Sequence, residues 1–222
     1  DALKRQQFRW AKGSIQTAKK LLPALWQSRQ PLAVKVQGTL HLTGYLLHPL
    51  MMIVLLLSLP MSWSQSPLLM WLPALLVTAL GPPLLFLSPQ WARGRAGRNS
   101  FGRLGLLILM GTGLAVNNTK AALEAVLGAE STFRRTPKFN LRGSSGDWAA
   151  SAYSLPSDPI VWLEVAAGLF ALVLMIGARW VNPLHTTPWL LIYMLGFGFV
   201  AGTSLWQTFG RALARRWRVV VT

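Results

Sequence analysis

Residues 36–59 read VQGTLHLTGYLLHPLMMIVLLLSL and hold no lysine, arginine, aspartate or glutamate. A helix needs about 20 consecutive apolar residues to cross the hydrocarbon core of a bilayer, so this stretch predicts a membrane-spanning helix. Three later windows have similar length and character, at residues 68–87, 159–181 and 188–209. Short links join the first window to the second and the third to the fourth. The four windows therefore predict two transmembrane hairpins.

The overall composition also indicates a membrane protein. Of the 222 residues, 52% are hydrophobic and 13% are charged, whereas about a quarter of a soluble domain is charged. A net charge of +16 brings nucleic-acid binding into consideration. The 22 lysines and arginines, however, lie in blocks between the apolar windows, which is typical of cytoplasmic loops. We therefore predict a lipid bilayer as a partner and no nucleic acid, and the lack of cysteine excludes disulfides and thiolate metal sites.

A fifth apolar stretch, residues 104–116, is short for a membrane span. If residues 1–35 are cytoplasmic and this stretch does not cross, every lysine and arginine except Arg179 lies on the cytoplasmic side. We therefore predict that residues 101–127 form an amphipathic interfacial helix with a narrow polar stripe of Asn117, Lys120 and Glu124. The predicted location is the plasma (inner) membrane, crossed several times, with both termini and the basic loops in the cytoplasm.

The first helix, residues 3–22, has two different faces. Its apolar stripe is Phe8, Ala11, Ile15, Ala18 and Leu22, and we expect this stripe to lie on the membrane.

The opposite face of this helix carries a Q-x-x-R-W motif made of Gln6, Arg9 and Trp10. An indole can stack on a sugar ring, while Gln6 and Arg9 can donate hydrogen bonds to hydroxyl or phosphate groups. The alternative is an interfacial anchor, with Trp10 at headgroup depth. From this motif alone both interpretations stay open.

A second basic motif lies in the long loop at residues 131–158, in the run Phe133-Arg134-Arg135-Thr136-Pro137-Lys138-Phe139. Three cations and a hydroxyl can close over a diphosphate. The alternative is a polybasic patch that touches anionic lipid.

Together the motifs resemble the membrane part of processive family-2 glycosyltransferases, of which cellulose synthase and β-mannan synthase are examples. The resemblance rests on Gln6-Gln7-Phe8-Arg9-Trp10-Ala11-Lys12-Gly13 before a two-span hairpin and on the F-x-x-T-x-K-type loop before another hairpin. Asn117-Asn118-Thr119-Lys120-Ala121, taken with that loop, looks more like the bacterial mannan-synthase-like branch.

The resemblance implies a role for each matching residue. Gln6, Arg9 and Trp10 would hold the acceptor end of the glycan, and a gating loop would cover the nucleotide diphosphate. The residues of that gating loop are Arg134, Arg135, Thr136 and Lys138. The chain has no D-x-D and no T-E-D motif, so the resemblance places the catalytic residues in a GT-A domain before Asp1. The divalent metal, Mg²⁺ or Mn²⁺, and most of the nucleotide-sugar site would belong to that domain, and this chain would bind no metal itself.

The predicted fold is therefore an all-α membrane region with four transmembrane helices in two hairpins and two amphipathic interfacial helices, without a catalytic GT-A domain. Its predicted segments run as follows: an interfacial helix with the motif at 1–32, a hairpin at 33–88, a basic loop and interfacial helix at 89–129, a gating-type loop at 130–158, a hairpin at 159–210 and a basic tail at 211–222.

The function that the resemblance implies is transfer of a sugar from a nucleotide-sugar donor to a growing β-glycan, with the helical bundle as the exit path of the polymer. A non-processive enzyme that glycosylates a membrane lipid would use the same acceptor motif. A non-enzymatic scaffold or transport subunit with basic lipid-binding loops is the third interpretation.

Three weaker features remain. His41 and His48 lie seven residues apart, and without further ligands they favour packing or hydrogen bonding over metal binding. Glu164 is the one acidic residue inside a predicted span, which makes it either a functional site or the partner of a nearby arginine. Tryptophans near the span ends are typical of an aromatic belt: Trp63, Trp71, Trp162, Trp180, Trp189 and Trp206.

Overall fold

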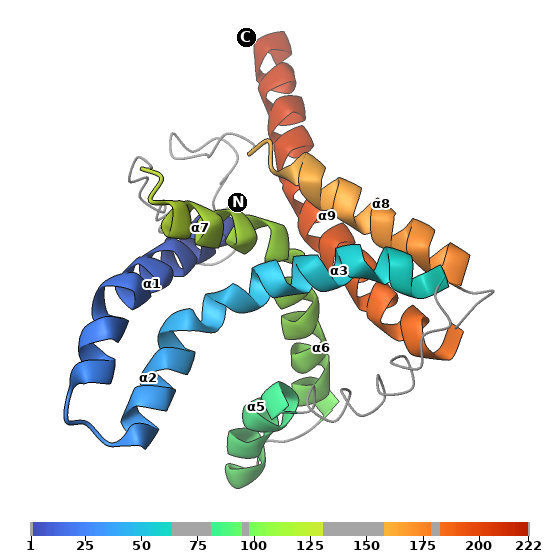
Figure 1. The fold of residues 1–222 in the computed structure, drawn as a ribbon. Coiled ribbons are helices and arrows are strands. Elements are labelled where there is room, and N and C mark those ends of the chain that lie inside the picture. The colour runs from blue at the N-terminus through green and yellow to red at the C-terminus, as the bar shows by residue number, and fades with distance from the viewer. Residues whose placement is uncertain (1, 64–80, 95–97, 131–157, 179–182, 222) are drawn as a thin grey trace. The chain divides into compact units, whose positions relative to one another are not determined.

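The computed structural model describes residues 2–63, 81–94, 98–130, 158–178 and 183–221, and the secondary structure in these ranges is helical without strands (Figure 1). This confirms the predicted all-α class for the described part of the chain. The helices are α1 (Ala2–Gln27), α2 (Leu32–Thr43), the 3₁₀ turn η1 (Gly44–Leu46), α3 (Leu47–Trp63), α5 (Gly81–Ala92), α6 (Arg98–Gly113), α7 (Ala115–Leu127), α8 (Val161–Ala178) and α9 (Pro183–Val221).

Two described helices are long and apolar enough to cross a membrane, at Leu32–Pro60 and Thr187–Phe209. A third span is possible if the bent pair Ser100–Gly113 and Ala115–Leu127 counts as one. The structure thus gives two to three candidate spans where the sequence predicted four. Most of the predicted window at 68–87 lies outside the described residues, and the apolar helix α8 is short.

The first candidate span is not one uniform helix, because η1 separates α2 from α3. Residue 49 is proline and has no N–H group to donate to the carbonyl of Tyr45 four residues earlier. The chain tightens into a 3₁₀ turn there, and the Nδ1 atom of His48 lies 3.4 Å from that carbonyl oxygen. A backbone N–H at the end of the 3₁₀ turn also donates to this oxygen, so the histidine ring shares the acceptor with it.

The chain divides into two compact units. The first comprises Asp1–Met52, Leu114–Leu163 and Ala201–Thr222, and the second comprises Ile53–Gly113 and Glu164–Val200. Each unit has its own packing and is described by itself.

In the first unit, α1 packs along α7 (Figure 1). Ile15 of α1 forms a buried cluster with Ala122 and Ala125 of α7, and Tyr45 and Leu46 of η1 cover it. Small side chains let two helices approach closely.

The predicted stripe of α1 is thus buried at Ala11, Ile15 and Ala18, but its partner is not the expected membrane. The prediction that this stripe lies on the bilayer is wrong, because α7 packs along this side of the helix.

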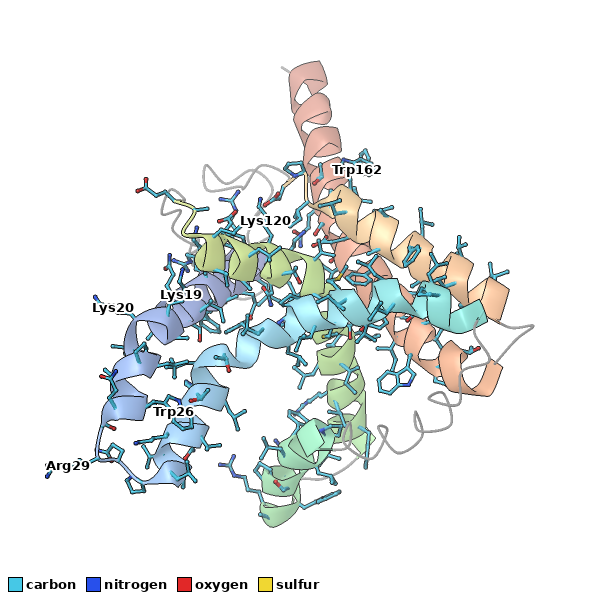
Figure 2. The ribbon with its side chains drawn as sticks, in the orientation of Figure 1. Lys19, Lys20, Trp26, Arg29, Lys120 and Trp162 are labelled. Atoms are coloured by element: carbon cyan, nitrogen blue, oxygen red, sulfur yellow. The ribbon has the colours of Figure 1, made fainter. Side chains whose placement is uncertain are left out.

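The predicted interfacial helix at residues 101–127 is also different in the structure. It breaks at Leu114 into α6 and α7, with a bend of 48°. Within the predicted polar stripe, Asn117 is buried and Glu124 forms an ion pair, so of the three only Lys120 is exposed (Figure 2). The stripe therefore serves contacts with α1 more than contacts with water.

In the second unit, glycines bring α9 close to two neighbouring helices. Gly196 lies against Thr112 and Gly113 of α6, and Gly168 of α8 lies against Phe197 of α9. A Cβ atom at Gly113 would collide with the carbonyl oxygen of Gly196. Backbone contact at this crossing requires glycine on both helices.

Candidate functional site

The Q-x-x-R-W motif lies on the side of α1 that is not packed against α7. Trp10 has 53% of its surface exposed, whereas Gln6 and Arg9 are half-buried. At 3.6 residues per turn, Trp10 lies about 140° around the helix axis from the buried Ile15. For Trp10, the sequence prediction that the motif faces away from the apolar stripe is confirmed.

Two lysines join the middle of α1 to the end of α7. The Nζ atom of Lys12 lies 2.8 Å from a carboxylate oxygen of Glu124 and 2.7 Å from the carbonyl oxygen of Ala129. The Nζ atom of Lys19 donates to the carbonyl of Val126 at 2.7 Å and to that of Ala125 at 3.3 Å. The last carbonyls of a helix lack backbone partners and carry partial negative charge. The two lysines therefore supply hydrogen bonds and charge where α7 needs both.

The end of α7 has a second stabilising feature. Gly128 takes the left-handed conformation with φ of 75°, and its N–H group donates to the carbonyl of Glu124. This is the usual helix end that favours glycine. It places the carbonyl of Ala129 where Lys12 reaches it.

Two asparagines join the start of α7 to the start of α1 and to His48 of α3. The side-chain amide of Asn117 donates to the backbone carbonyl of Lys4 and to Oδ1 of Asn118, both at 3.0 Å. The amide nitrogen of Asn118 lies 3.1 Å from Nε2 of His48. Both asparagines are buried, and these contacts satisfy polar groups that would otherwise be costly to bury.

The same group of residues reaches the motif helix by a second route. The hydroxyl of Tyr45 donates to Oε1 of Gln7 at 3.3 Å, next to Gln6 in the sequence. The rings of Tyr45 and His48 stack with centroids 5.9 Å apart. Thus η1 and α7 both contact the first two turns of α1, and α3 contacts α7 through His48.

The sequence anticipated only part of this arrangement. A hydrogen-bonding role for His48 is confirmed, but His41 is exposed and forms no common site with it. The buried role of Asn117 was missed, and Asn118 was not singled out as a site residue. The one signal in the sequence is a pair of asparagines inside a largely apolar helix.

Other predicted site residues stand as follows. Arg134, Arg135, Thr136 and Lys138 lie outside the described residues. Glu164 is fully buried in the first turn of α8, where the helix dipole favours a negative charge. In the described ranges, no group of three histidine, aspartate or glutamate side chains is placed to hold a metal ion.

No family model matches this chain, and no curated protein or solved structure shows significant similarity to it. What the chain does is therefore inferred from its own residues.

Proposed function

We propose that this chain is the membrane part of an inverting glycosyltransferase that transfers sugar from a nucleotide donor to a growing β-glycan. One observation carries the proposal: Trp10 offers a half-exposed indole on a helix whose other side is tied to α7 by buried polar contacts. A rigid, exposed aromatic ring with Gln6 and Arg9 beside it is chemically suited to a sugar acceptor.

In this proposal the other parts of the reaction lie elsewhere. Arg134, Arg135, Thr136 and Lys138 cover the donor diphosphate. A catalytic domain outside this sequence supplies the general base and the Mg²⁺ or Mn²⁺ site, because in-line attack by an acceptor hydroxyl needs a base and neutralisation of the diphosphate. The basic loops face the cytoplasm, and the helical bundle gives the polymer its way out.

A specific observation favours a second candidate, a non-enzymatic membrane protein in which α1 is an anchor. Leu3, Trp10 and Leu21 are all at least 39% exposed. At 3.6 residues per turn they fall within about 20° of one line along α1. Such a line is also what an interfacial helix presents to lipid, and here Trp10 would lie at headgroup depth.

The two candidates differ in what loss of the indole does. The test uses the full open reading frame expressed in membranes and measures incorporation of label from a panel of nucleotide sugars. Trp10→Ala is compared with Trp26→Ala, because Trp26 is on the same helix and has a similar exposure of 46%. We expect Trp10→Ala to lose transfer, and Trp26→Ala to retain it, at equal membrane insertion.

Three results would decide against the proposal. No incorporation by the wild type with any donor would remove the glycosyltransferase function. Equal activity of Trp10→Ala and wild type would make Trp10 an anchor. Equal loss in both variants would show a general need for tryptophan at the interface. The length of the product then separates a processive enzyme from one that glycosylates a lipid.

A further inference from the structure

The buried polar contacts between α1, α7 and α3 form one chain with a fixed direction. It begins at the backbone carbonyl of Lys4, passes through Asn117, Asn118 and His48, and ends at the backbone carbonyl of Tyr45. A backbone carbonyl can only accept a hydrogen bond. Both ends of this hydrogen-bond chain are therefore groups that can only accept.

These two ends determine the orientation of every group between them. Asn117 must turn its NH₂ group to Lys4 and to Oδ1 of Asn118, so Asn118 must turn its own NH₂ group to His48. His48 must then accept at Nε2, while Nδ1 carries the proton that faces Tyr45. A neutral imidazole with its proton on Nδ1 meets both demands.

Because this hydrogen-bond chain has one direction, the orientation of each side chain in it depends on the orientations of the others. If Asn118 turned its amide over, its NH₂ group would face the NH₂ group of Asn117. If Asn117 then turned as well, its oxygen would face the carbonyl oxygen of Lys4. Asn117 and Asn118 are 3% and 1% exposed, so bulk solvent does not reach them to replace a lost hydrogen-bond partner. The hydrogen-bond chain therefore favours one register of α1 on α7.

This register determines where the motif lies. Lys4, whose carbonyl accepts from Asn117, lies two residues before Gln6. Gln7, which directly follows Gln6, accepts a hydrogen bond from the hydroxyl of Tyr45. We propose that Asn118 and His48 are positioning residues for the acceptor motif, holding the first turns of α1 so that Gln6, Arg9 and Trp10 present one fixed geometry. This inference rests on the proposed glycosyltransferase function.

Asn118→Asp gives the sharpest test, because it keeps the size of the side chain, replaces the donor NH₂ group by an oxygen and adds a negative charge. The carboxylate still accepts from Asn117 but places an oxygen against the lone pair of His48. His48 can answer by moving a proton to Nε2, at the cost of its contact with Tyr45 unless it takes a second proton. The matched control is Thr119→Val on the next residue, since the buried Oγ1 of Thr119 has no hydrogen-bond partner among the described residues.

The first readout is sugar transfer by the full-length protein in membranes at varied acceptor and donor concentrations. We expect Asn118→Asp to raise the KM for the acceptor about tenfold, the effect of one buried hydrogen bond, with the KM for the nucleotide sugar unchanged. His48→Leu should behave likewise, and His48→Gln should recover most of the loss because its side-chain oxygen can accept. Thr119→Val should resemble the wild type.

The second readout is ¹⁵N NMR of the histidine side chains in labelled protein in lipid, with the spectrum of His48→Gln used for assignment. It needs no catalytic activity. We expect the wild-type His48 ring to be neutral with its proton on Nδ1, and we expect Nε2 to carry a proton in Asn118→Asp.

Each outcome decides a separate point. A wild-type His48 ring with its proton on Nε2 would overturn the proposed direction of the hydrogen-bond chain. Unchanged acceptor KM in Asn118→Asp, with transfer intact, would overturn the positioning role alone. Parallel rises in both KM values, or failure of His48→Gln to recover activity, would make the two residues merely structural. Absence of transfer in the wild type would overturn the proposed function and, with it, the acceptor role of these residues.

Discussion

The ion pair of Lys12 with Glu124 gives the most direct test of how α1 is held on α7. The side chains are 9% and 23% exposed, and their charged atoms are 2.8 Å apart. Lys12 also donates to the carbonyl of Ala129 at 2.7 Å. Lys12→Met keeps the apolar stem of the side chain in place and removes only the ammonium group, so its effect measures the contacts of that group, these two among them.

The magnitude follows from the burial of each partner. Removing one member of a fully buried pair costs about 3–5 kcal/mol, whereas an exposed pair contributes about 0–1 kcal/mol. Glu124 is partly accessible and Ala129 is exposed, so water recovers part of the loss at both acceptors. We expect Lys12→Met to destabilise the α1–α7 packing by about 2 kcal/mol, between these limits.

Hydrogen–deuterium exchange measures this locally, without unfolding the whole protein. A loss of about 2 kcal/mol raises the rate of exchange through local opening about 30-fold, read in peptides from α7. Lys20→Met is the control, because Lys20 is exposed on the same helix about two turns after Lys12 (Figure 2). Glu124→Gln and the double variant complete a cycle that separates the ion pair from the other contacts of Lys12.

Two results would refute the reasoning. Equal exchange in Lys12→Met and Lys20→Met would show that the buried ammonium adds nothing to the packing. Faster exchange confined to peptides from α2, with α7 unchanged, would show that Lys12 stabilises a different contact.

Two glycine substitutions test other parts of the packing. Gly196→Ala places a Cβ atom 2.8 Å from Cβ of Thr112, so we expect the unfolding free energy in detergent to fall by about 1–3 kcal/mol. Gly198→Ala is the control on the same helix: a Cβ atom there has nothing within 4 Å, so this change should be neutral or stabilising. Equal effects of the two substitutions would contradict the close crossing. Alanine in place of Gly128 must adopt a φ of 75°, so we expect the unfolding free energy to fall by about 1 kcal/mol and amide exchange at the end of α7 to become faster. Gly13→Ala is the control, because Gly13 is an open helical position where alanine should raise the unfolding free energy. A higher unfolding free energy in both variants would contradict the left-handed helix end.

The helical class and the buried residues of α1 followed from the sequence, but the partner of those residues did not. Hydrophobic periodicity identifies Ala11, Ile15 and Ala18 as one face, and that face is buried. Periodicity cannot say whether protein or lipid covers it, because both are apolar. The cover came from α7, which is more than 100 residues away in sequence.

The helix predicted at residues 101–127 breaks at Leu114, and the polar stripe predicted on it meets protein for a related reason. Asn117, Lys120 and Glu124 form a polar stripe by spacing, and a polar stripe ordinarily indicates water. In the structure a backbone carbonyl of α1 accepts from Asn117, and Lys12 pairs with Glu124. Polar side chains with hydrogen-bond or ion-pair partners inside the protein have the same spacing as those that face solvent. The sequence pattern alone therefore does not distinguish the two cases.

The site motif shows the same division between what a local pattern decides and what only packing decides. The exposed side of α1 with Trp10 was predictable from helical geometry. The contacts of Asn118 and His48 were not, because they join residues 70 positions apart.

Small side chains mark part of the faces on which these helices meet protein, alongside larger ones such as Leu174 of α8, which is also buried. Lipid competes equally well for any apolar side chain, so helices in and near a bilayer pair through small residues and directed polar contacts. On α8 the buried positions include Ala167, Gly168 and Ala171, whereas Leu169 and Val173 are 56% and 65% exposed. The pairing of α1 with α7 follows the same rule, with alanines at its centre and lysines and asparagines at its ends. An apolar stripe rich in alanine and glycine therefore predicts a helix partner, and one rich in leucine and tryptophan, such as Leu3, Trp10 and Leu21, predicts lipid or ligand.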